Sequence, residues 1–386
     1  MQSKFGLIWP VLASLVLPLV AAWFAYPGTH LPPGFGVFPP QFVQDPPPFS
    51  LLVFCAILLV ELALAAFLLF PAWFGFRPVP PAPPFRRASL PAWFWIGAVL
   101  TLFFWWLMWT RPTTPPLGPL VPYSFTPMWW GFILVLDGLV YYRCGGRSLL
   151  ARRPKTLLIS ALVSVPGWYF FEYFDYFVLE NWYYPNAAIL PHATIVVLFL
   201  LAYTTVWPAI FEWYTLLESF PRFAVRYSNG PKLSLPGSLL LWGGLLMIVL
   251  TVFWPYPLFW AMWIGPLIVI GGQLIRMNIW TPFTAMAQGN WSPLLLVALS
   301  SLCNGLFWEI WNYGSAHPDP ALQTNPNYWI YDVPYVNVIH LFAEMPLLGF
   351  AGYLPFGVLV WVVFIWAGKL FGFDASLGSA GNAPPR

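Results

Sequence analysis

Acidic residues within apolar runs are the first feature of this sequence that could do chemistry. A carboxyl group in such surroundings can hold or relay a proton, bind a cation, or protonate a lipophilic substrate. An acid at the centre of a membrane-spanning helix costs roughly 2.5–3.5 kcal/mol on insertion scales, so each is a candidate for function. Of the 13 acidic residues, those within apolar runs are Glu61, Asp137, Glu172, Asp175, Glu212, Glu309 and Glu344.

One spacing of polar residues occurs twice. Glu172, Asp175 and Tyr176 are spaced i, i+3, i+4, which places them on one face of a helix. Glu309, Asn312 and Tyr313 repeat this spacing in a later apolar run. The functional interpretation is a polar site between two helices. The structural alternative is that the glutamates are neutral and bond to facing helices, which fixes how those helices dock.

His340 and Glu344 add a second pair. Their i, i+4 spacing places them on one face of the last predicted helix, at a depth similar to that of the glutamates. One His with three carboxylates could ligate a divalent metal, and His340 alone could ligate a haem or chlorophyll-type ring. Neither spacing is diagnostic, so the sequence assigns no cofactor and no metal. The predicted pocket consists of Glu172, Glu309, His340 and Glu344, closed by Trp308, Trp311 and Tyr313.

The other three acids are expected to have structural roles. Glu61 and Asp137 have no repeated counterpart. Glu212 lies near the predicted cytoplasmic end of its run and is expected to reach the interface.

The composition identifies the elements that must position these residues. The 386 residues are 60% hydrophobic, 20% aromatic and only 8% charged, against roughly 25% charge in soluble domains. Apolar runs of about 20 residues alternate with Pro-rich breaks, as in helical membrane proteins. The net charge of +3 and the absence of a basic stripe argue against a nucleic-acid partner. We therefore predict an all-α, polytopic helical membrane protein.

Apolar runs and the basic residues between them predict the topology. With ten spans and both termini cytoplasmic, 15 of the 16 basic residues lie on the cytoplasmic side and only Arg111 lies outside. The aromatic segments 182–184 and 328–331 are expected at the outer membrane interface. The predicted spans are 6–26, 50–72, 91–110, 126–142, 156–178, 192–216, 236–254, 257–275, 293–313 and 335–367, the last of them kinked or split by Pro346 and Pro355.

The sequence also indicates an internal duplication. Segments 89–91, 128–131, 171–176 and 181–183 match segments 234–236, 262–265, 308–313 and 327–329 in the same order. We expect two four-span repeats in the same orientation, related by an axis along the membrane normal. The predicted parts are a two-span extension (1–85), repeat A (86–226), repeat B (232–372) and a cytoplasmic tail (373–386).

The C-terminal third resembles a known kind of protein. Residues 307–313, with their Trp-Glu-x-Trp-Asn-Tyr pattern, and residues 344–356, with Glu-Met-Pro-Leu-Leu-Gly-Phe, resemble a family of bacterial multi-pass membrane proteins. The resemblance implies a bacterial cytoplasmic (inner) membrane protein. It supports grouping Glu309, Asn312 and Glu344 together, but it implies no activity. There is also an analogy to membrane lycopene cyclases, although their Pro-x-Glu-Glu pattern is missing.

Three function classes remain open from the sequence. The first is a transporter or ion/proton-translocating protein with its site between the repeats. The second is an intramembrane enzyme acting on a polyprenyl, carotenoid or lipid-like substrate, with Glu309 or Glu344 as proton donor. The third is a non-catalytic scaffold or pigment-associated subunit of a membrane complex. The expected partners are accordingly the lipid bilayer, a lipophilic small molecule or ion, and subunits of such a complex.

The predicted topology can be tested with reporter fusions in a bacterial host. We expect a green fluorescent protein fused after Arg386 to fluoresce, because that terminus is predicted to be cytoplasmic. Alkaline phosphatase fused after Thr113 should be active, because this loop is predicted to be external. Phosphatase activity of a fusion after Arg386 would contradict the ten-span topology.

Overall fold

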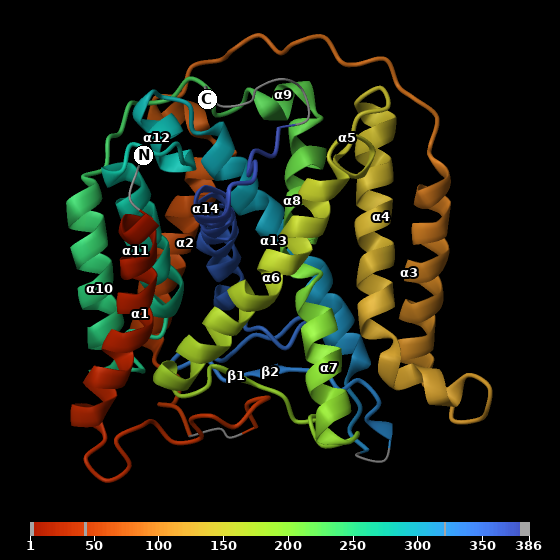
Figure 1. Cartoon of the computed structure of the whole chain (residues 1–386), viewed down its shortest axis with the longest axis vertical. Coiled ribbons are helices and arrows are strands. Elements are labelled where there is room, and N and C mark those ends of the chain that lie inside the picture. The colour runs from red at the N-terminus through yellow and green to blue at the C-terminus, as the bar shows by residue number, and fades with distance from the viewer. Residues whose placement is uncertain (1–3, 42–44, 320–321, 379–386) are drawn as a thin grey trace.

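The computed structural model describes residues 4–41, 45–319 and 322–378, and they form a bundle of helices (Figure 1). The α-helices are α1 (Lys4–Ala25), α2 (Leu51–Leu69), α3 (Ala92–Thr110), α4 (Phe125–Arg143), α5 (Leu149–Arg152), α6 (Pro154–Asp175), α7 (His192–Tyr203), α8 (Val206–Glu218), α9 (Pro221–Ala224), α10 (Gly237–Phe253), α11 (Ala261–Arg276), α12 (Pro282–Ala287), α13 (Ser292–Ser315) and α14 (Tyr353–Phe371). The short elements are 3-10 helices η1 (Pro71–Phe74), η2 (Gly118–Tyr123), η3 (Tyr176–Val178) and η5 (Leu347–Gly352), and strands β1 (Trp182–Tyr183) and β2 (Ile330–Tyr331).

The helical membrane class agrees with this architecture. Within the described residues, seven helical segments are long and apolar enough to cross a bilayer. They are Lys4–Ala25, Leu51–Leu69, Ala92–Thr110, Pro154–Val178, His192–Glu218, Ser292–Ser315 and Leu347–Phe371. The apolar helices α10 and α11 are shorter, with 17 and 16 residues. The count of ten spans therefore stays a prediction.

The predicted span 192–216 corresponds to one apolar helical segment, His192–Glu218, in which a turn at Thr204 and Thr205 separates α7 from α8. Another predicted span differs from the observed helices. The run 335–367 is not one helix, nor two half-helices: residues up to Pro346 are irregular, η5 follows, and α14 begins at Tyr353. Pro346 ends the irregular stretch, whereas Pro355 lies in the first turn of α14, where a missing N–H breaks no helical hydrogen bond.

Two helix pairs pack through glycines. In α3 and α4, a Cβ atom on Gly97 would lie 2.6 Å from the backbone oxygen of Gly131. In α10 and α11, a Cβ atom on Gly244 would lie 2.8 Å from the backbone oxygen of Gly265. Glycine allows this close backbone approach in both pairs, as is common between membrane helices.

The aromatic segments 182–184 and 328–331 lie near one end of the bundle and turn into the protein (Figure 1). Trp182, Tyr184 and Tyr328 are buried. The two segments meet in a two-stranded antiparallel ladder, with Trp182 opposite Tyr331 and Tyr183 opposite Ile330 (Figure 1). The pairing satisfies backbone groups in a buried loop that would otherwise lack partners.

Adjacent glycines of α10 provide a matched test of helix packing. We expect Gly244→Ala to lower the unfolding free energy by about 1–3 kcal/mol, because the methyl group would clash with Val269 and Gly265. Gly243→Ala should leave stability unchanged or raise it slightly, because a Cβ atom there meets nothing within 4 Å. Thermal unfolding in detergent measures the stability of both variants. Equal melting temperatures for the two would refute the close contact.

Candidate functional site

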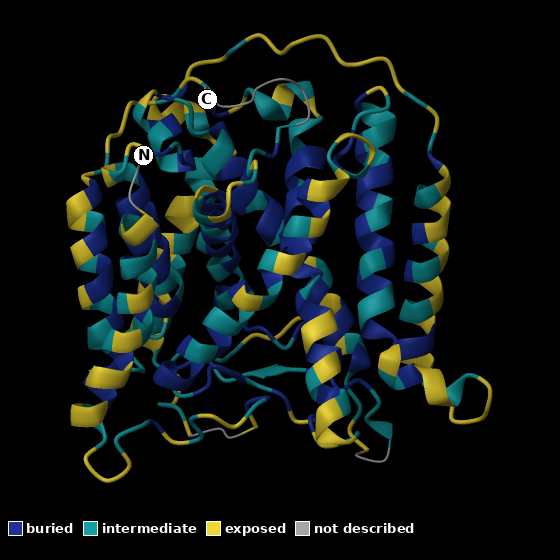
Figure 2. Cartoon of the chain, in the orientation of Figure 1, coloured by how far each residue is buried: buried dark blue, intermediate teal, exposed yellow. Residues whose placement is uncertain are grey.

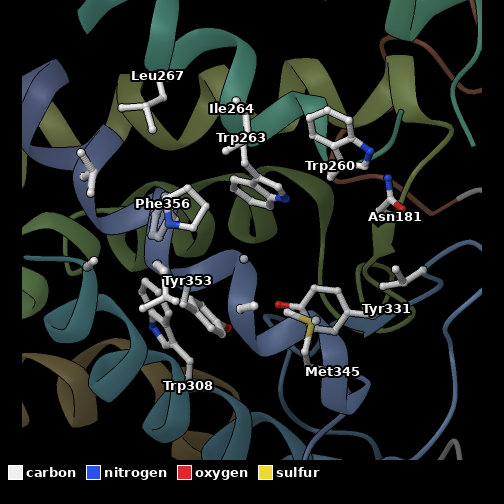
Figure 3. Close-up of a pocket in the computed structure, with 18 of the residues that line it drawn as sticks. Asn181, Trp260, Trp263, Ile264, Leu267, Trp308, Tyr331, Met345, Tyr353 and Phe356 are labelled. Atoms are coloured by element: carbon white, nitrogen blue, oxygen red, sulfur yellow. The ribbon is translucent and has the colours of Figure 1, made fainter. Parts of the chain in front are cut away.

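A cavity of about 960 Å³ lies within the bundle, between α2, α11, α13, α14 and the connections that carry β1 and β2 (Figure 3). Its walls are apolar and rich in aromatic rings, which include Trp168, Trp263, Trp308 and Phe356. Rings of Trp168 and Trp308 pack together with centroids 6.1 Å apart. A cavity of this size and character suits a lipophilic molecule.

Glu309 of α13 lies behind this wall, fully buried, and is held by tyrosines that line the cavity. Its Oε1 atom accepts hydrogen bonds from the hydroxyls of Tyr353 (2.6 Å) and Tyr331 (3.1 Å). Its Oε2 atom accepts the backbone N–H of Met345 at 3.3 Å. Figure 3 shows the Tyr331 and Tyr353 side chains near each other at the cavity. Both hydroxyls donate to the same oxygen of Glu309.

Glu172 of α6 has an equivalent arrangement. Its Oε1 atom accepts hydrogen bonds from the hydroxyls of Tyr184 (2.6 Å) and Tyr203 (2.8 Å) and from the indole N–H of Trp168 (2.8 Å). These three donors also line the cavity. In each cluster one tyrosine comes from the connection after the glutamate helix, and the other from the next helix. The cavity therefore contacts two carboxyl–tyrosine clusters.

The tyrosines of the connections stay protonated at neutral pH. Burial, followed by the nearby Glu172 carboxylate, raises the pKa of Tyr184 well above its ordinary value. Burial and Glu309 raise the pKa of Tyr331 in the same way. Both hydroxyls are therefore available as donors, which is the role the hydrogen bonds assign to them.

Asp175 and Asn312 position the connections instead of entering the cavity. The Oδ1 atom of Asp175 accepts the backbone N–H of Asn181 at 2.9 Å. Asn312 accepts the backbone N–H of Trp329 at 3.1 Å and donates to the Trp329 carbonyl at 2.7 Å. Neither lines the cavity. Each side chain ties the segment after its helix back to the helix end, close to the strand that follows.

His340 and Glu344 do not form the predicted part of the pocket. Both lie in the irregular segment before η5, so the expected helix face does not exist. His340 is exposed, and its Nδ1 atom lies 2.8 Å from the backbone oxygen of Glu344, not from its carboxyl group. Glu344 accepts a hydrogen bond from Tyr328 at 2.7 Å. Neither residue lines the cavity.

Of the three aromatic residues predicted to close the pocket, only Trp308 lines the cavity. Trp311 packs against Trp129 and Phe132 on the other side of α13, and Tyr313 is exposed. Among the described residues, no three His, Cys, Asp or Glu side chains gather where they could hold a metal ion.

Glu212 does not reach an interface, because it is fully buried against Asp137. The carboxyl groups of Asp137 and Glu212 lie close to each other. Asp137 accepts hydrogen bonds from Trp93 Nε1, Ser148 Oγ and the Leu150 N–H at 2.8–2.9 Å. This pair joins α4 to α8 and does not line the cavity.

Sequence reasoning missed the four tyrosines. Tyr184 and Tyr331 were assigned to an interface, and Tyr203 and Tyr353 were treated as part of apolar runs. A signal was available: both Glu172 and Glu309 are followed by tyrosines in the connection after their helix and again in the next apolar run. Buried carboxyl groups need donors, and tyrosine is the donor that an apolar segment tolerates best.

In comparisons with known proteins, no family model, no curated sequence and no solved structure matches this chain.

The Glu309 cluster predicts a measurable coupling. We expect Tyr353→Phe to lower the unfolding free energy by about 1–3 kcal/mol, because a buried carboxyl group loses a donor. In a double-mutant cycle with Glu309→Gln, the two changes should be non-additive by at least about 0.5 kcal/mol. Tyr313 is exposed and lies on α13, the helix of Glu309, so Tyr313→Phe is the control and should not change the unfolding free energy. Additive effects of Tyr353→Phe and Glu309→Gln would contradict the arrangement.

Proposed function

We propose that this protein is an intramembrane enzyme that binds a polyprenyl, carotenoid or similar lipid-like molecule in its cavity and acts on it by proton transfer. The observation that carries this proposal is the cavity wall itself. Its aromatic and aliphatic surface suits a hydrocarbon chain, and four tyrosines in that surface are bonded to buried Glu172 and Glu309.

Glu309 and Tyr353 are the pair best suited to the chemistry. A proton can move along their 2.6 Å hydrogen bond, and the tyrosine ring borders the cavity. Starting from protonated Glu309, Tyr353 passes its hydroxyl proton to a carbon–carbon double bond and takes the proton of Glu309 in its place, which leaves a carbocation on the substrate and a carboxylate on Glu309. Loss of another proton from the cation back to this carboxylate closes the cycle. Faces of Trp308 and Trp263 can stabilise the positive charge between the two steps.

The side of the cavity at α2 supports entry from lipid. No residue of α2 is buried, although seven of its residues line the cavity: Ala56, Ile57, Val60, Glu61, Leu64, Phe67 and Leu68. The helix is held near its two ends, where Ser50 N bonds to Tyr335 O at 3.0 Å and Tyr227 bonds to Leu68 O at 2.7 Å. A lightly packed helix over an apolar cavity is a natural entrance for a lipid-like substrate.

The duplication and topology are part of the same proposal. The glycine contacts of α3 with α4 and of α10 with α11 support repeats A (86–226) and B (232–372), as do the two glutamate–tyrosine clusters. We place the protein in a bacterial cytoplasmic membrane, with ten spans and both termini inside, following the charge distribution and the family resemblance. Transport of the same ligand and a scaffold role are outcomes of the test below.

Blocking the cavity tests ligand binding. We expect protein purified from native membranes to carry a lipophilic molecule that mass spectrometry of an organic extract identifies. Ala56→Trp should reduce its amount at least several-fold, because this exposed position lines the cavity and leaves room for a large side chain that narrows it. Ala63→Trp, on the same helix but outside the lining, is the matched control.

Glu309→Gln separates catalysis from other uses of the cavity. This variant should retain the bound molecule but accumulate an unconverted form, because the amide cannot supply the proton. Identical extracts from wild type and Glu309→Gln, together with movement of the ligand between vesicle leaflets, would favour transport. If the extracts contain no bound molecule, the result would contradict the enzyme proposal and favour a scaffold role.

A further inference from the structure

Glu61 is the one ionisable carboxyl group that lines the cavity among its described wall residues. It lies in the middle of α2, on the helix face that also carries Ile57, Leu64 and Leu68 toward the cavity. The carboxyl groups of Glu172 and Glu309 differ, because they lie behind their tyrosines. A ligand in the cavity can therefore touch the Glu61 carboxyl group directly.

The Glu61 side chain lacks a partner. Its Oε1 atom is buried and has no hydrogen bond to any described residue. A buried polar atom without a partner is unusual, since most such atoms are bonded to protein or to a bound molecule. Oε2 of Glu172 is also buried without a partner among the described residues, but the Oε1 atoms of Glu172 and Glu309 each accept at least two hydrogen bonds, and no described residue donates to Oε1 of Glu61. Glu61 is thus an acceptor with an open position, at the wall of a cavity already suited to a ligand.

The charges of the residues around the cavity indicate which kind of polar head group a bound ligand can have. None of the described residues that line it is Lys, Arg or His. A phosphate or carboxylate head group would therefore enter an apolar space without a cation and beside an acid, which is strongly unfavourable. A head group that donates a hydrogen bond can instead bond to the Glu61 carboxyl group. This hydrogen bond is stronger if the head group is cationic.

We propose that the cavity takes a long-chain lipid whose polar group is a hydrogen-bond donor, a hydroxyl or a protonated amine, and that Glu61 accepts its hydrogen bond. This inference rests on the proposed function, since it assumes a lipid-binding cavity, and adds the class of head group. With the polar group at Glu61 on α2, the hydrocarbon chain extends along the aromatic wall toward the glutamate–tyrosine clusters.

Four probes with one twenty-carbon prenyl chain test the assignment: the alcohol, the primary amine, the phosphate and the hydrocarbon without a head group. Binding is measured on the full chain in lipid nanodiscs. We expect wild-type protein to bind the alcohol and the amine about tenfold or more tighter than the hydrocarbon, and the phosphate more weakly than the hydrocarbon.

Variants of Glu61 distinguish the two donors. Glu61→Leu should abolish the preference for the alcohol and the amine while leaving hydrocarbon binding within threefold. Glu61→Gln, which keeps an acceptor but loses the charge, should retain most of the preference for the alcohol and lose that for the amine. Leu62→Gln, an exposed neighbour outside the cavity lining, is the control and should match wild type.

Each other outcome is also decisive. Phosphate binding as tight as that of the alcohol, or an unchanged alcohol preference in Glu61→Leu, would overturn the head-group assignment while hydrocarbon binding keeps the proposed cavity function intact. Failure of every probe, the hydrocarbon included, would overturn both proposals. Since no residue of α2 is buried, these substitutions should not alter the melting temperature, which is measured alongside.

Discussion

The hydrogen bonding of buried carboxyl groups in an apolar protein is the constraint on which the rest of this structure depends. Glu172 and Glu309 lie where water cannot satisfy them, so the chain must supply donors. Tyrosine meets this need because its ring packs like an apolar residue and its hydroxyl donates one hydrogen bond. To deliver Tyr184 and Tyr331, the connections must turn inward, and β1 and β2 pair there. The inner wall of the cavity follows from this arrangement.

The opposite wall has no such constraint. Helix α2 contributes a face to the cavity but buries none of its residues, and contacts near its ends hold it in place. Figure 2 shows this contrast between the buried helices of the interior and the exposed faces at the periphery. One wall is thus fixed by a network of side-chain hydrogen bonds, whereas the other is held by hydrogen bonds near the two ends of α2 and by apolar contact between them. A lipid-like ligand needs such a combination, because the reacting groups must be rigid and the entrance must not be.

Composition and periodicity predict the helices well, because a helix that satisfies its own backbone in an apolar setting depends mainly on run length. All ten predicted ranges contain a helix, but ranges with Pro and Gly near a polar side chain, such as 335–352, do not follow the rule. There the segment is shaped by distant partners: Met345 N–H bonds to Glu309, and Tyr328 to Glu344. The local sequence pattern cannot predict such long-range hydrogen bonds. Glu172 and Glu309 could be found from their repeated spacing, whereas their tyrosines lie too far along the chain for any helical period.

The Glu172 and Glu309 clusters differ in their hydrogen-bond donors, and one of these differences bears on the proposed chemistry. Four residues before Glu172 stands Trp168, whose indole N–H adds a third donor to the same carboxyl oxygen. Four residues before Glu309 stands Gly305, and the Tyr353 ring occupies the space, since a Cβ atom there would lie 2.5 Å from that ring. The glycine brings the ring of Tyr353 against α13 and its hydroxyl to 2.6 Å from Glu309. Glu172 accepts three hydrogen bonds through Oε1, whereas Glu309 accepts two through Oε1 and one from the Met345 N–H through Oε2. In the proposed reaction the Gly305 difference matters for another reason: it lets Tyr353, whose ring borders the cavity, approach Glu309 closely enough to relay a proton between this carboxyl group and a ligand.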